Sequence, residues 1–504
     1  MNFALFNELH ARSDPQALAL ADERCRFDRR ALEQWACRFA NWLVGQGCKP
    51  GDRLSIFLPN RAEVVIALLG AFKAGVVPVP LNWRLGGDEL RRVFLHSDAR
   101  AVVTDQDHAA LFAQAGNAAV LEVRPQAMEG SFWHELGAQP DRFQSFQAQA
   151  DDIANLLYTS GSTSAPKAAI HTHGMRVAIA SAMADCFQLS RQDVALGLSP
   201  IFHTSGLSVL SNALMVGCPL VTMEKWDLEQ FARTVERERV SFLHMIGTLV
   251  VDVAQAPAAI FGDVRNNGGL RFTWGGGHSV ATETFMEYER RMGGVFLQGY
   301  SRTEGGLTYN PLGPERSFIH NGLANRNSSE VAIFDCETRL RSAAGDSGEI
   351  CVRGDGVSPG YWDGQYIRAP RLLDGGWQPT GDAGVIAADG NLYFQGRLDL
   401  MIKTGGENVY PEEVSSALLK IAGVKDVAVC GIPDERLGTR LAALVVAEAG
   451  SGLDSESLVA AGRAHLGGFK IPRVIRFVDA LPRLGNGKVD LVACRKVALG
   501  PERA

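Results

Sequence analysis

The chain contains 504 residues, which is enough for one large domain and a small one. Hydrophobic residues make up 46% of it and charged residues 21%, proportions that are usual for globular proteins and exclude disordered, collagen-like and coiled-coil chains. The formal net charge is −6 and no block of lysine and arginine stands out, so we expect neither a nucleic-acid partner nor binding to an anionic membrane.

The cysteines and the N-terminus indicate the cellular compartment. Nine cysteines are scattered along the chain without Cys-x-x-Cys spacing, a pattern typical of reduced, buried thiols. The stretch from Met1 to Glu8 has no basic segment followed by an apolar one, so we expect no signal peptide. The longest apolar run, Val64 to Phe72, is too short for a membrane span. These features predict a cytoplasmic protein.

Helices and strands are expected to alternate in the first part of the chain. Apolar residues recur at helical spacing from Leu32 to Leu43, and the helix is expected to end at Gly45. Strands are predicted at 53–58, 76–79 and 101–104, and helices at 61–73 and 87–95. This alternation is typical of parallel sheets covered by helices. Residues 107–150 show little pattern and are expected to be connecting structure.

A loop of small hydroxylated residues follows the apolar run 153–157. From Thr159 to Lys167 it reads Thr-Ser-Gly-Ser-Thr-Ser-Ala-Pro-Lys. Small side chains let backbone N–H groups approach a phosphate, hydroxyl groups add donors, and Lys167 adds positive charge. It is not a Walker A loop, because proline precedes the lysine and two alanines follow it. A phosphate-binding loop and a solvated surface loop both fit this composition.

The second half of the chain changes character twice. After more α/β material to about residue 310, short β-type runs separated by Gly, Asp and Pro at about 330–396 predict a small barrel or a distorted sheet. Beyond Arg397 the pattern is that of a self-sufficient α+β unit. We therefore expect an α/β fold with a large N-terminal domain at 1–396 and a small C-terminal domain at 400–504.

Further motifs follow the loop in a fixed order. They are Tyr-Ser-Arg-Thr-Glu at 300–304, Thr-Gly-Asp at 380–382, Gly-Arg-Leu-Asp at 396–399 leading into Thr-Gly-Gly at 404–406, and Gly-Asn-Gly-Lys at 485–488. In this order, together with the loop, they resemble the acyl-adenylate-forming superfamily of AMP-forming acid–CoA ligases, peptide-synthetase adenylation domains and beetle luciferases. The resemblance covers nearly the whole chain.

The resemblance implies a reaction in two steps. A carboxylate attacks the α-phosphate of MgATP to give an acyl-adenylate and pyrophosphate, and the thiol of coenzyme A then displaces AMP. Because both reactants of the first step are anionic, cations and amide donors must neutralise them. ATP, Mg²⁺ and CoA are the implied cofactor and co-substrates, and the partner is a small-molecule carboxylic acid.

The resemblance also implies an ATP site. The triphosphate would be held by Thr159, Ser160, Gly161, Ser162, Thr163 and Lys167, adenine by Gly275, Gly276, Gly277, Gln298, Gly299 and Tyr300, and ribose by Asp382 and Arg397. Ordinary tight turns are the alternative for the glycines and for Asp382.

The implied catalytic residues are Lys488, Glu304, Thr303 and His203. Lys488 would bridge the substrate carboxylate and an α-phosphate oxygen, where negative charge develops. Glu304 would hold Mg²⁺, a hard ion that prefers carboxylate and phosphate oxygens. A solvated lysine and a surface carboxylate are the alternatives.

For the second step, the resemblance implies that the C-terminal domain is mobile and rotates about a hinge at 397–399. Asp399 would absorb the torsional change. Thr404, Gly405, Gly406 and Phe469 would meet CoA, with Thr404 to Gly406 brought to the active site by the rotation.

By the same resemblance, the acyl pocket is lined by Phe202, His203, Trp274, Gly299 and Gly305. No acidic residue stands where amino-acid-activating relatives hold an ammonium group, which argues against a peptide synthetase. Trp274 replaces a small residue and predicts a shortened pocket for a small to medium acid. His203 flanks the substrate carboxylate, or it is a packed core histidine.

Some alternatives remain open at this stage. Arg302 is unusually large for its place in the motif, and a surface salt bridge is favoured over binding of a second carboxylate. The enzyme could instead load a carrier protein, or be luciferase-like. A homodimer is possible.

Overall fold

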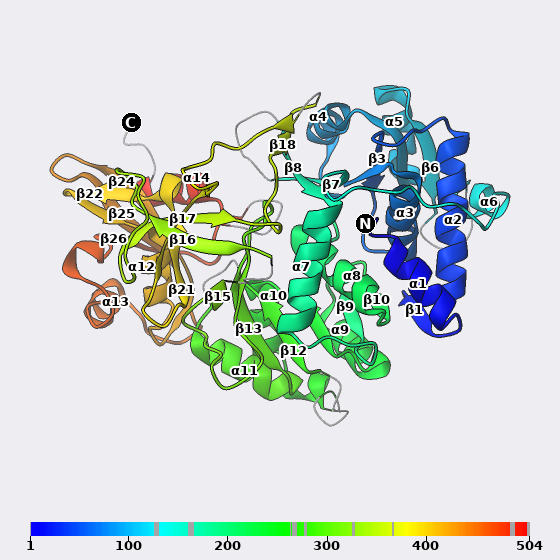
Figure 1. Ribbon diagram of the computed structural model, residues 1–504. Coiled ribbons are helices and arrows are strands. Elements are labelled where there is room, and N and C mark those ends of the chain that lie inside the picture. The colour runs from blue at the N-terminus through cyan, green and yellow to red at the C-terminus, as the bar shows by residue number, and fades with distance from the viewer. Residues whose placement is uncertain are drawn as a thin grey trace.

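The computed structural model describes residues 2–124, 131–159, 166–262, 264, 270–276, 280–324, 328–364, 367–483 and 489–500. The predicted α/β class is confirmed, with parallel sheets in the larger part of the chain and a separate C-terminal unit (Figure 1).

One parallel sheet lies near the N-terminus, in the order β4-β3-β5-β6. Its strands are β3 (Arg53–Phe57), β4 (Val77–Pro80), β5 (Ala99–Asp105) and β6 (Ala119–Val123). The helices around it are α2 (Arg29–Gly45), α3 (Ala62–Ala74), α4 (Gly87–Ser97), α5 (Gln106–Ala115) and α6 (Ser131–Gly137). Residues 107–150 are therefore not only connecting structure, as expected, because α5, β6 and α6 fall there. These elements are short and alanine-rich, and α5 buries only Phe112 among its residues, so their periodic signal is weak.

The largest sheet carries a long run of parallel strands. Its order is β15-β14-β13-β12-β11-β9-β10-β1-β2, and pairing is parallel from β1 through β13. The strands are β1 (Leu18–Ala21), β2 (Arg26–Asp28), β9 (Ala195–Gly197), β10 (Leu220–Thr222), β11 (Phe242–His244), β12 (Phe272–Gly275), β13 (Val295–Tyr300), β14 (Thr308–Tyr309) and β15 (Leu323–Ala324).

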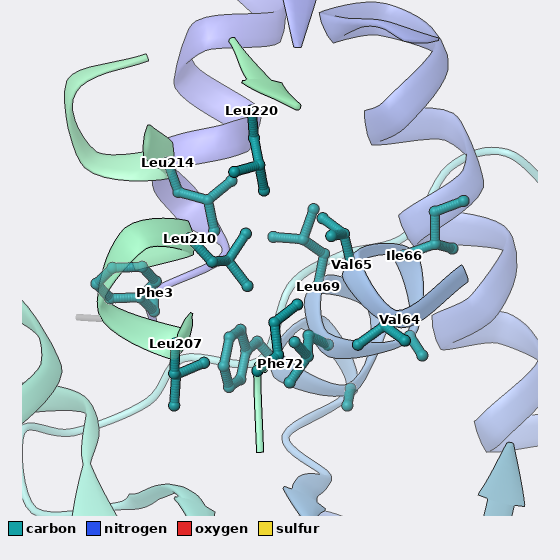
Figure 2. Packing of buried hydrophobic residues seen from close by; sticks show 14 of the residues in the cluster. Phe3, Val64, Val65, Ile66, Leu69, Phe72, Leu207, Leu210, Leu214 and Leu220 are labelled. Atoms are coloured by element: carbon teal, nitrogen blue, oxygen red, sulfur yellow. The ribbon is translucent and has the colours of Figure 1, made fainter. Parts of the chain in front are cut away.

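Helices cover both faces of this sheet. The helices are α1 (Leu5–Ser13), α7 (His173–Cys186), α8 (Thr204–Val216), α9 (Leu228–Glu238), α10 (Gly247–Gln255), η1 (Ala258–Phe261) and α11 (Thr282–Met292). Alternate strand residues point to opposite cores, because Phe242 packs with α7 and α8 whereas Leu243 packs with α9 to α11. Figure 2 shows the first core, where residues of α3 face Leu207, Leu210 and Leu214 of α8.

Two further sheets stand beside the large one. The strands β7 (Ile153–Tyr158) and β8 (Ala168–Thr172) form a hairpin, which continues into β18 (Tyr361–Trp362) and β19 (Ile367–Arg368). An antiparallel sheet contains β16 (Glu330–Phe334), β17 (Ser347–Arg353), β20 (Gln378–Ile386) and β21 (Leu392–Arg397), with irregular register in β17 and β20. Of the two forms predicted for 330–396, the distorted sheet is the one observed.

The C-terminal elements surround their own cores. They are η2 (Leu398–Leu400), β22 (Ile402–Thr404), β23 (Glu407–Val409), α12 (Pro411–Leu418), β24 (Val424–Asp434), β25 (Gly438–Ala447), α13 (Ser455–Gly462), η3 (Gly468–Lys470), β26 (Val474–Phe477) and α14 (Leu491–Leu499). The sheet β24-β25-β26 is covered by helices and packs into two clusters made only of C-terminal residues. This is the α+β arrangement that the sequence predicts.

The nine cysteines are free thiols, and Cys336 is the exposed one, whereas the others are buried or half-buried. Cys336 lies close enough to the Tyr410 hydroxyl to add to the effect of burial in raising the pKa of that tyrosine. Across the described part of the chain, no helix has both the length and the apolar character needed to cross a bilayer.

Candidate active site

The ends of three parallel strands meet at one edge of the large sheet. In the register, His244 of β11 pairs with Trp274 of β12, and Gly275 of β12 pairs with Gln298 of β13. Ligands of parallel sheets bind at the carboxyl ends of the strands. The predicted adenine and acyl segments therefore come together here.

Close backbone approach explains the glycines at this edge. A methyl group on Gly275 would lie 2.1 Å from the carbonyl oxygen of Met245, and one on Gly276 would lie 2.4 Å from that of Gly299. Such distances are well below contact, so residues with a Cβ are excluded. These glycines are therefore required by the close packing of neighbouring backbone segments at this edge.

A buried hydrogen bond joins two of the predicted nucleotide residues. The Tyr300 hydroxyl lies 2.6 Å from Oδ2 of Asp382 and donates to it. The Tyr300 ring stacks on Phe394 at 5.9 Å between centroids. Burial raises the pKa of Asp382, and the hydrogen bond from Tyr300 opposes that rise. Tyr300 thus binds Oδ2 of the carboxylate, whereas Arg397 lies nearest to Oδ1.

Arg397 connects Asp382 to the predicted hinge residue. Its guanidinium lies 3.6 Å from the Asp382 carboxylate and donates two hydrogen bonds of 2.9 Å to Asp399. The Arg397 side chain is half exposed. The predicted ribose contact and the predicted hinge therefore share one chain of ion pairs.

The Glu304 carboxylate lies between a tyrosine and an arginine. Tyr361 donates a 2.6 Å hydrogen bond to Oε1, and a guanidinium nitrogen of Arg302 lies 3.4 Å from Oε2. Next to it, the Thr303 carbonyl oxygen lies 2.7 Å from Nε2 of His171. The charge of Glu304 also acts on Asp382, the hydrogen-bond partner of Tyr300.

The surface salt bridge favoured for Arg302 is wrong. Its side chain is only 11% exposed, and its charge acts on Tyr300, Glu304, Asp382 and Tyr361. The chain turns inward after β13, which brings the guanidinium between two acidic side chains. Local sequence pattern does not reveal such burial.

The phosphate-loop candidate spans the turn of the β7–β8 hairpin. The Thr159 N–H donates to the Lys167 carbonyl oxygen at 3.2 Å, which closes the base of the loop, and Lys167 is exposed. Six of the predicted site residues lie outside the described residues, namely Ser160, Gly161, Ser162, Thr163, Gly277 and Lys488.

The predicted acyl residues border the first core. The Phe202 and His203 rings are 4.4 Å apart, and α8 begins at the next residue. The Trp274 indole is buried rather than turned outward, and it packs between Phe187 and Phe242. His203 is half-buried, so it is not a fully packed core histidine.

Two of the predicted acyl glycines show why larger residues are excluded. Gly305 has φ +87°, and a methyl group there would lie 2.0 Å from the Gly356 carbonyl oxygen. A methyl group on Gly299 would lie 2.6 Å from the carbonyl oxygen of Thr308, on the neighbouring strand. Both positions bring backbone segments into direct contact.

The predicted CoA residues belong to the C-terminal unit. Thr404, Gly405 and Gly406 lie in the β22–β23 hairpin, where the Gly405 N–H donates to the Leu437 carbonyl oxygen at 3.1 Å. Phe469 lies in η3, is 45% exposed and contacts Lys470 through a cation–π interaction. Within the described residues, these contacts are made inside the C-terminal unit, not with the Tyr300–Asp382 pair.

Comparison with known proteins assigns the family. Residues 7–362 match the family described as AMP-binding enzyme, and residues 413–488 match the AMP-binding enzyme C-terminal domain. The chain belongs to the AMP-binding enzyme family. This AMP-binding enzyme is 32% identical to a feruloyl-CoA synthase of Amycolatopsis sp. over 486 residues, with 95% of each chain covered.

Further relatives of this AMP-binding enzyme agree. It is 31% identical to a 3-[(3aS,4S,7aS)-7a-methyl-1,5-dioxo-octahydro-1H-inden-4-yl]propanoyl:CoA ligase of Mycobacterium tuberculosis over 502 residues, with 96% of each chain covered. The crystal structure of ATP-bound MatB from Rhodopseudomonas palustris superposes with a TM-score of 0.89 at 29% identity and covers 99% of each chain. The prediction of an AMP-forming acid–CoA ligase is confirmed.

Sequence reasoning missed three residues of this AMP-binding enzyme's site. Tyr361 reaches Glu304 only because β18 pairs with β8. His171 reaches Thr303 from the same hairpin. Glu412, at the start of α12, is half-buried and its charge interacts with Asp382 and Arg397. None of them belongs to a recognised motif, so only the three-dimensional pairing identifies them.

Proposed function

We propose that this AMP-binding enzyme activates a small to medium carboxylic acid with MgATP as an acyl-adenylate and transfers the acyl group to the thiol of CoA. The meeting of Tyr300, Asp382 and Glu304 at one edge of a parallel sheet carries the proposal. The membership of the family and the acid–CoA ligases among its relatives support it.

The nucleotide would lie across the strand ends. Asp382 accepts hydrogen bonds from the ribose hydroxyls, and Arg397 adds a further ribose contact. The backbone at Gly275, Gly276, Gly277, Gln298 and Gly299 faces adenine. Thr159, Ser160, Gly161, Ser162, Thr163 and Lys167 hold the triphosphate. The 3.6 Å contact between Arg397 and Asp382 supports this assignment, because it keeps the ribose-binding carboxylate next to a cation.

The residues present fit a magnesium ion at Glu304. Its side chain is 14% exposed. Oε2 lies 3.4 Å from Arg302, which is a long contact. Among the described residues no cluster of three metal-ligating side chains occurs. This suits Mg²⁺, which is usually held by one or two carboxylates together with substrate phosphates. When bound, the ion would neutralise charge on the phosphate oxygens.

Lys488 would complete the first step by contacting both the substrate carboxylate and the α-phosphate. For the second step, the unit at 400–504 would rotate about 397–399, with Asp399 as the hinge. Gly405 and Gly406 would then line a narrow passage for the CoA arm. The cores of the C-terminal unit support this rotation, because both of its apolar clusters are made of C-terminal residues.

The acyl end is expected to be short. Phe202, His203, Trp274, Gly299 and Gly305 would line it, and the buried Trp274 indole occupies volume that a long chain would need. A cytoplasmic location and a possible homodimer remain predictions from the sequence.

The test measures pyrophosphate exchange and AMP release over a panel of carboxylic acids, with and without CoA. We expect exchange without CoA, and AMP with a CoA thioester when CoA is present. Exchange without any CoA-dependent turnover would favour loading of a carrier protein. Failure of every acid to support exchange would contradict the proposal.

A further inference from the structure

An arginine without an acidic partner is buried between α7 and α8. Arg176 is 2% exposed. Its Nη2 donates to the Leu207 carbonyl oxygen at 2.9 Å and to the Ser211 hydroxyl. Its Nη1 is buried and finds no hydrogen-bond partner among the described residues. No aspartate or glutamate of the described residues forms an ion pair with it, in contrast to Arg24, Arg29 and Arg61.

A buried guanidinium without an acidic partner destabilises the folded protein unless an anion binds to it. Burial lowers the pKa of Arg176 to about 9, so the side chain is still a cation at neutral pH. A buried charge is normally paired. A leucine or methionine would fill the same space without the cost of desolvation. The planar guanidinium is also the side chain best suited to bind a carboxylate with two parallel hydrogen bonds.

Arg176 contacts the helix that follows the residues assigned to the acyl group. Its partners Leu207 and Ser211 are on α8, the helix that begins directly after His203. The preceding residue, Met175, has its terminal methyl group 3.1 Å from where a Cβ on Gly305 would lie.

A chain of aromatic side chains connects the surroundings of Arg176 to Trp274. Tyr309 lies close enough to Arg176 for their charges to interact, and it pairs with Gly299 across the β13–β14 ladder. Its ring contacts Phe187 at 5.3 Å, and Phe187 contacts Trp274 at 5.7 Å. Arg176 is therefore linked to Gly299 and Trp274 through Tyr309 and Phe187.

The other candidate cation is engaged elsewhere. Arg302 contacts Glu304, and its charge also acts on Asp382, so it belongs to the nucleotide side. His171 lies near Arg176, but burial lowers the pKa of His171 to about 3, which keeps it neutral. Arg176 is thus the positive charge available to the acyl end among these three.

We propose that Arg176, with the hydroxyl group of Tyr309, binds a second carboxylate of the acid substrate, so that the enzyme acts on dicarboxylic acids. This inference rests on the proposed function, since it names the class of acid that the same site takes. One carboxylate would react at the ATP side while the other pairs with the buried guanidinium.

The test compares dicarboxylic acids with monocarboxylic acids of equal chain length, using kcat/KM for CoA thioester formation. We expect the wild-type enzyme to prefer the dicarboxylic acid by about 100-fold or more, because a site built for a polar group rejects the analogue that lacks it. Arg176→Leu should abolish this preference while the monocarboxylic acid is used at least as well as before. Arg176→Lys should keep part of this preference, since the positive charge remains but the planar guanidinium is lost.

Binding measured without turnover provides the second readout. An excess of dicarboxylic acid should raise the Tm of the wild-type protein and of the control variant Arg29→Leu, whose guanidinium is buried but paired with Asp14, and should not raise that of Arg176→Leu. A wild-type preference for monocarboxylic acids, or an unchanged preference in Arg176→Leu, overturns the inference. If Arg176→Leu does not fold, the preference of the wild-type enzyme and of Tyr309→Phe for dicarboxylic over monocarboxylic acids tests the inference instead. Absence of adenylation with every acid would instead overturn the proposed function, and the Tm comparison would still test Arg176.

Discussion

The hydroxyl of Tyr300 donates a 2.6 Å hydrogen bond to Oδ2 of Asp382, and this bond links two buried side chains that are 82 positions apart in sequence. It joins the end of β13 in the large parallel sheet to β20 in the antiparallel sheet. Burial raises the pKa of Asp382 and the bond from Tyr300 lowers it. Tyr300, together with Arg302 and Arg397, therefore favours the ionised form of the proposed ribose-binding carboxylate.

Replacing this phenol should change how AMP binding depends on pH. The ionised form of Asp382 accepts the ribose hydrogen bonds, so AMP affinity is complete above the raised pKa and is lost as the pH falls through it. Tyr300→Phe removes the bond that stabilises the ionised form, and the loss should then begin at higher pH. At neutral pH we expect AMP to bind about tenfold more weakly, the usual effect of losing a hydrogen bond to a charged group. Calorimetric titration at several pH values measures this, and an unchanged pH profile would refute it.

Tyr361 should control the response to magnesium. It donates to Oε1 of Glu304 at 2.6 Å and so orients the proposed metal ligand. Tyr361→Phe should raise the Mg²⁺ concentration needed for half-maximal pyrophosphate exchange by about tenfold or more, which is typical of lost partners of metal ligands. Tyr393→Phe on β21, whose ring packs on His320, is the matched control. An equal Mg²⁺ response in both variants would count against Glu304 as the ligand.

Lys488 should be needed for the first step alone. Lys488→Ala should abolish acyl-adenylate formation and leave thioester formation from supplied acyl-AMP nearly intact, because the proposed contacts of the lysine are with the substrate carboxylate and the α-phosphate. Single-turnover assays of each half-reaction measure the two effects. Equal losses in both steps would show that the assignment is wrong.

Gly406 should be needed for the second step and not for the first. It has φ +90° and no neighbour within 4 Å of a Cβ, so a leucine would strain the backbone without a clash and would narrow the proposed passage for CoA. Gly406→Leu should slow thioester formation and spare adenylation. Gly438→Leu is the control, because Gly438 also has a positive φ and open space around it. If both leucine variants transfer the acyl group at the same rate, Gly406 does not line the passage.

Gly305 should be among the least replaceable glycines. Gly305→Ala would combine a φ of +87° with a methyl group 2.0 Å from the Gly356 carbonyl oxygen, whereas Gly345→Ala has a φ of +93° and free space. We expect the free energy of unfolding to fall by about 1–2 kcal/mol in Gly345→Ala from backbone strain. In Gly305→Ala, where the segments must also move apart, we expect a loss above about 4 kcal/mol. Urea titrations of both variants measure the difference.

The sequence predicted the motifs well and their surroundings poorly. The strand ends at Gly275 and Tyr300 and the position of Asp382 could be recognised because each has a local signature of glycine or acidic residues, although Asp382 lies within β20 and not in a tight turn. The inward turn of Arg302 and the contact of Tyr361 with Glu304 could not, because both depend on strand pairing between distant segments. Arg176 stands in an ordinary helical pattern, and only packing reveals that it lacks an acidic partner among the described residues.

The exposed thiol of Cys336 can carry a fluorescent label that follows the reaction cycle. Because the remaining eight thiols are buried or half-buried, a maleimide fluorophore should attach first at Cys336, without any engineered cysteine. This residue stands on the larger part of the chain beside Tyr410, which precedes α12 of the C-terminal unit. Rotation of that unit would change the polarity around the dye, so stopped-flow emission after addition of ATP, acid and CoA would time each rearrangement in the native sequence.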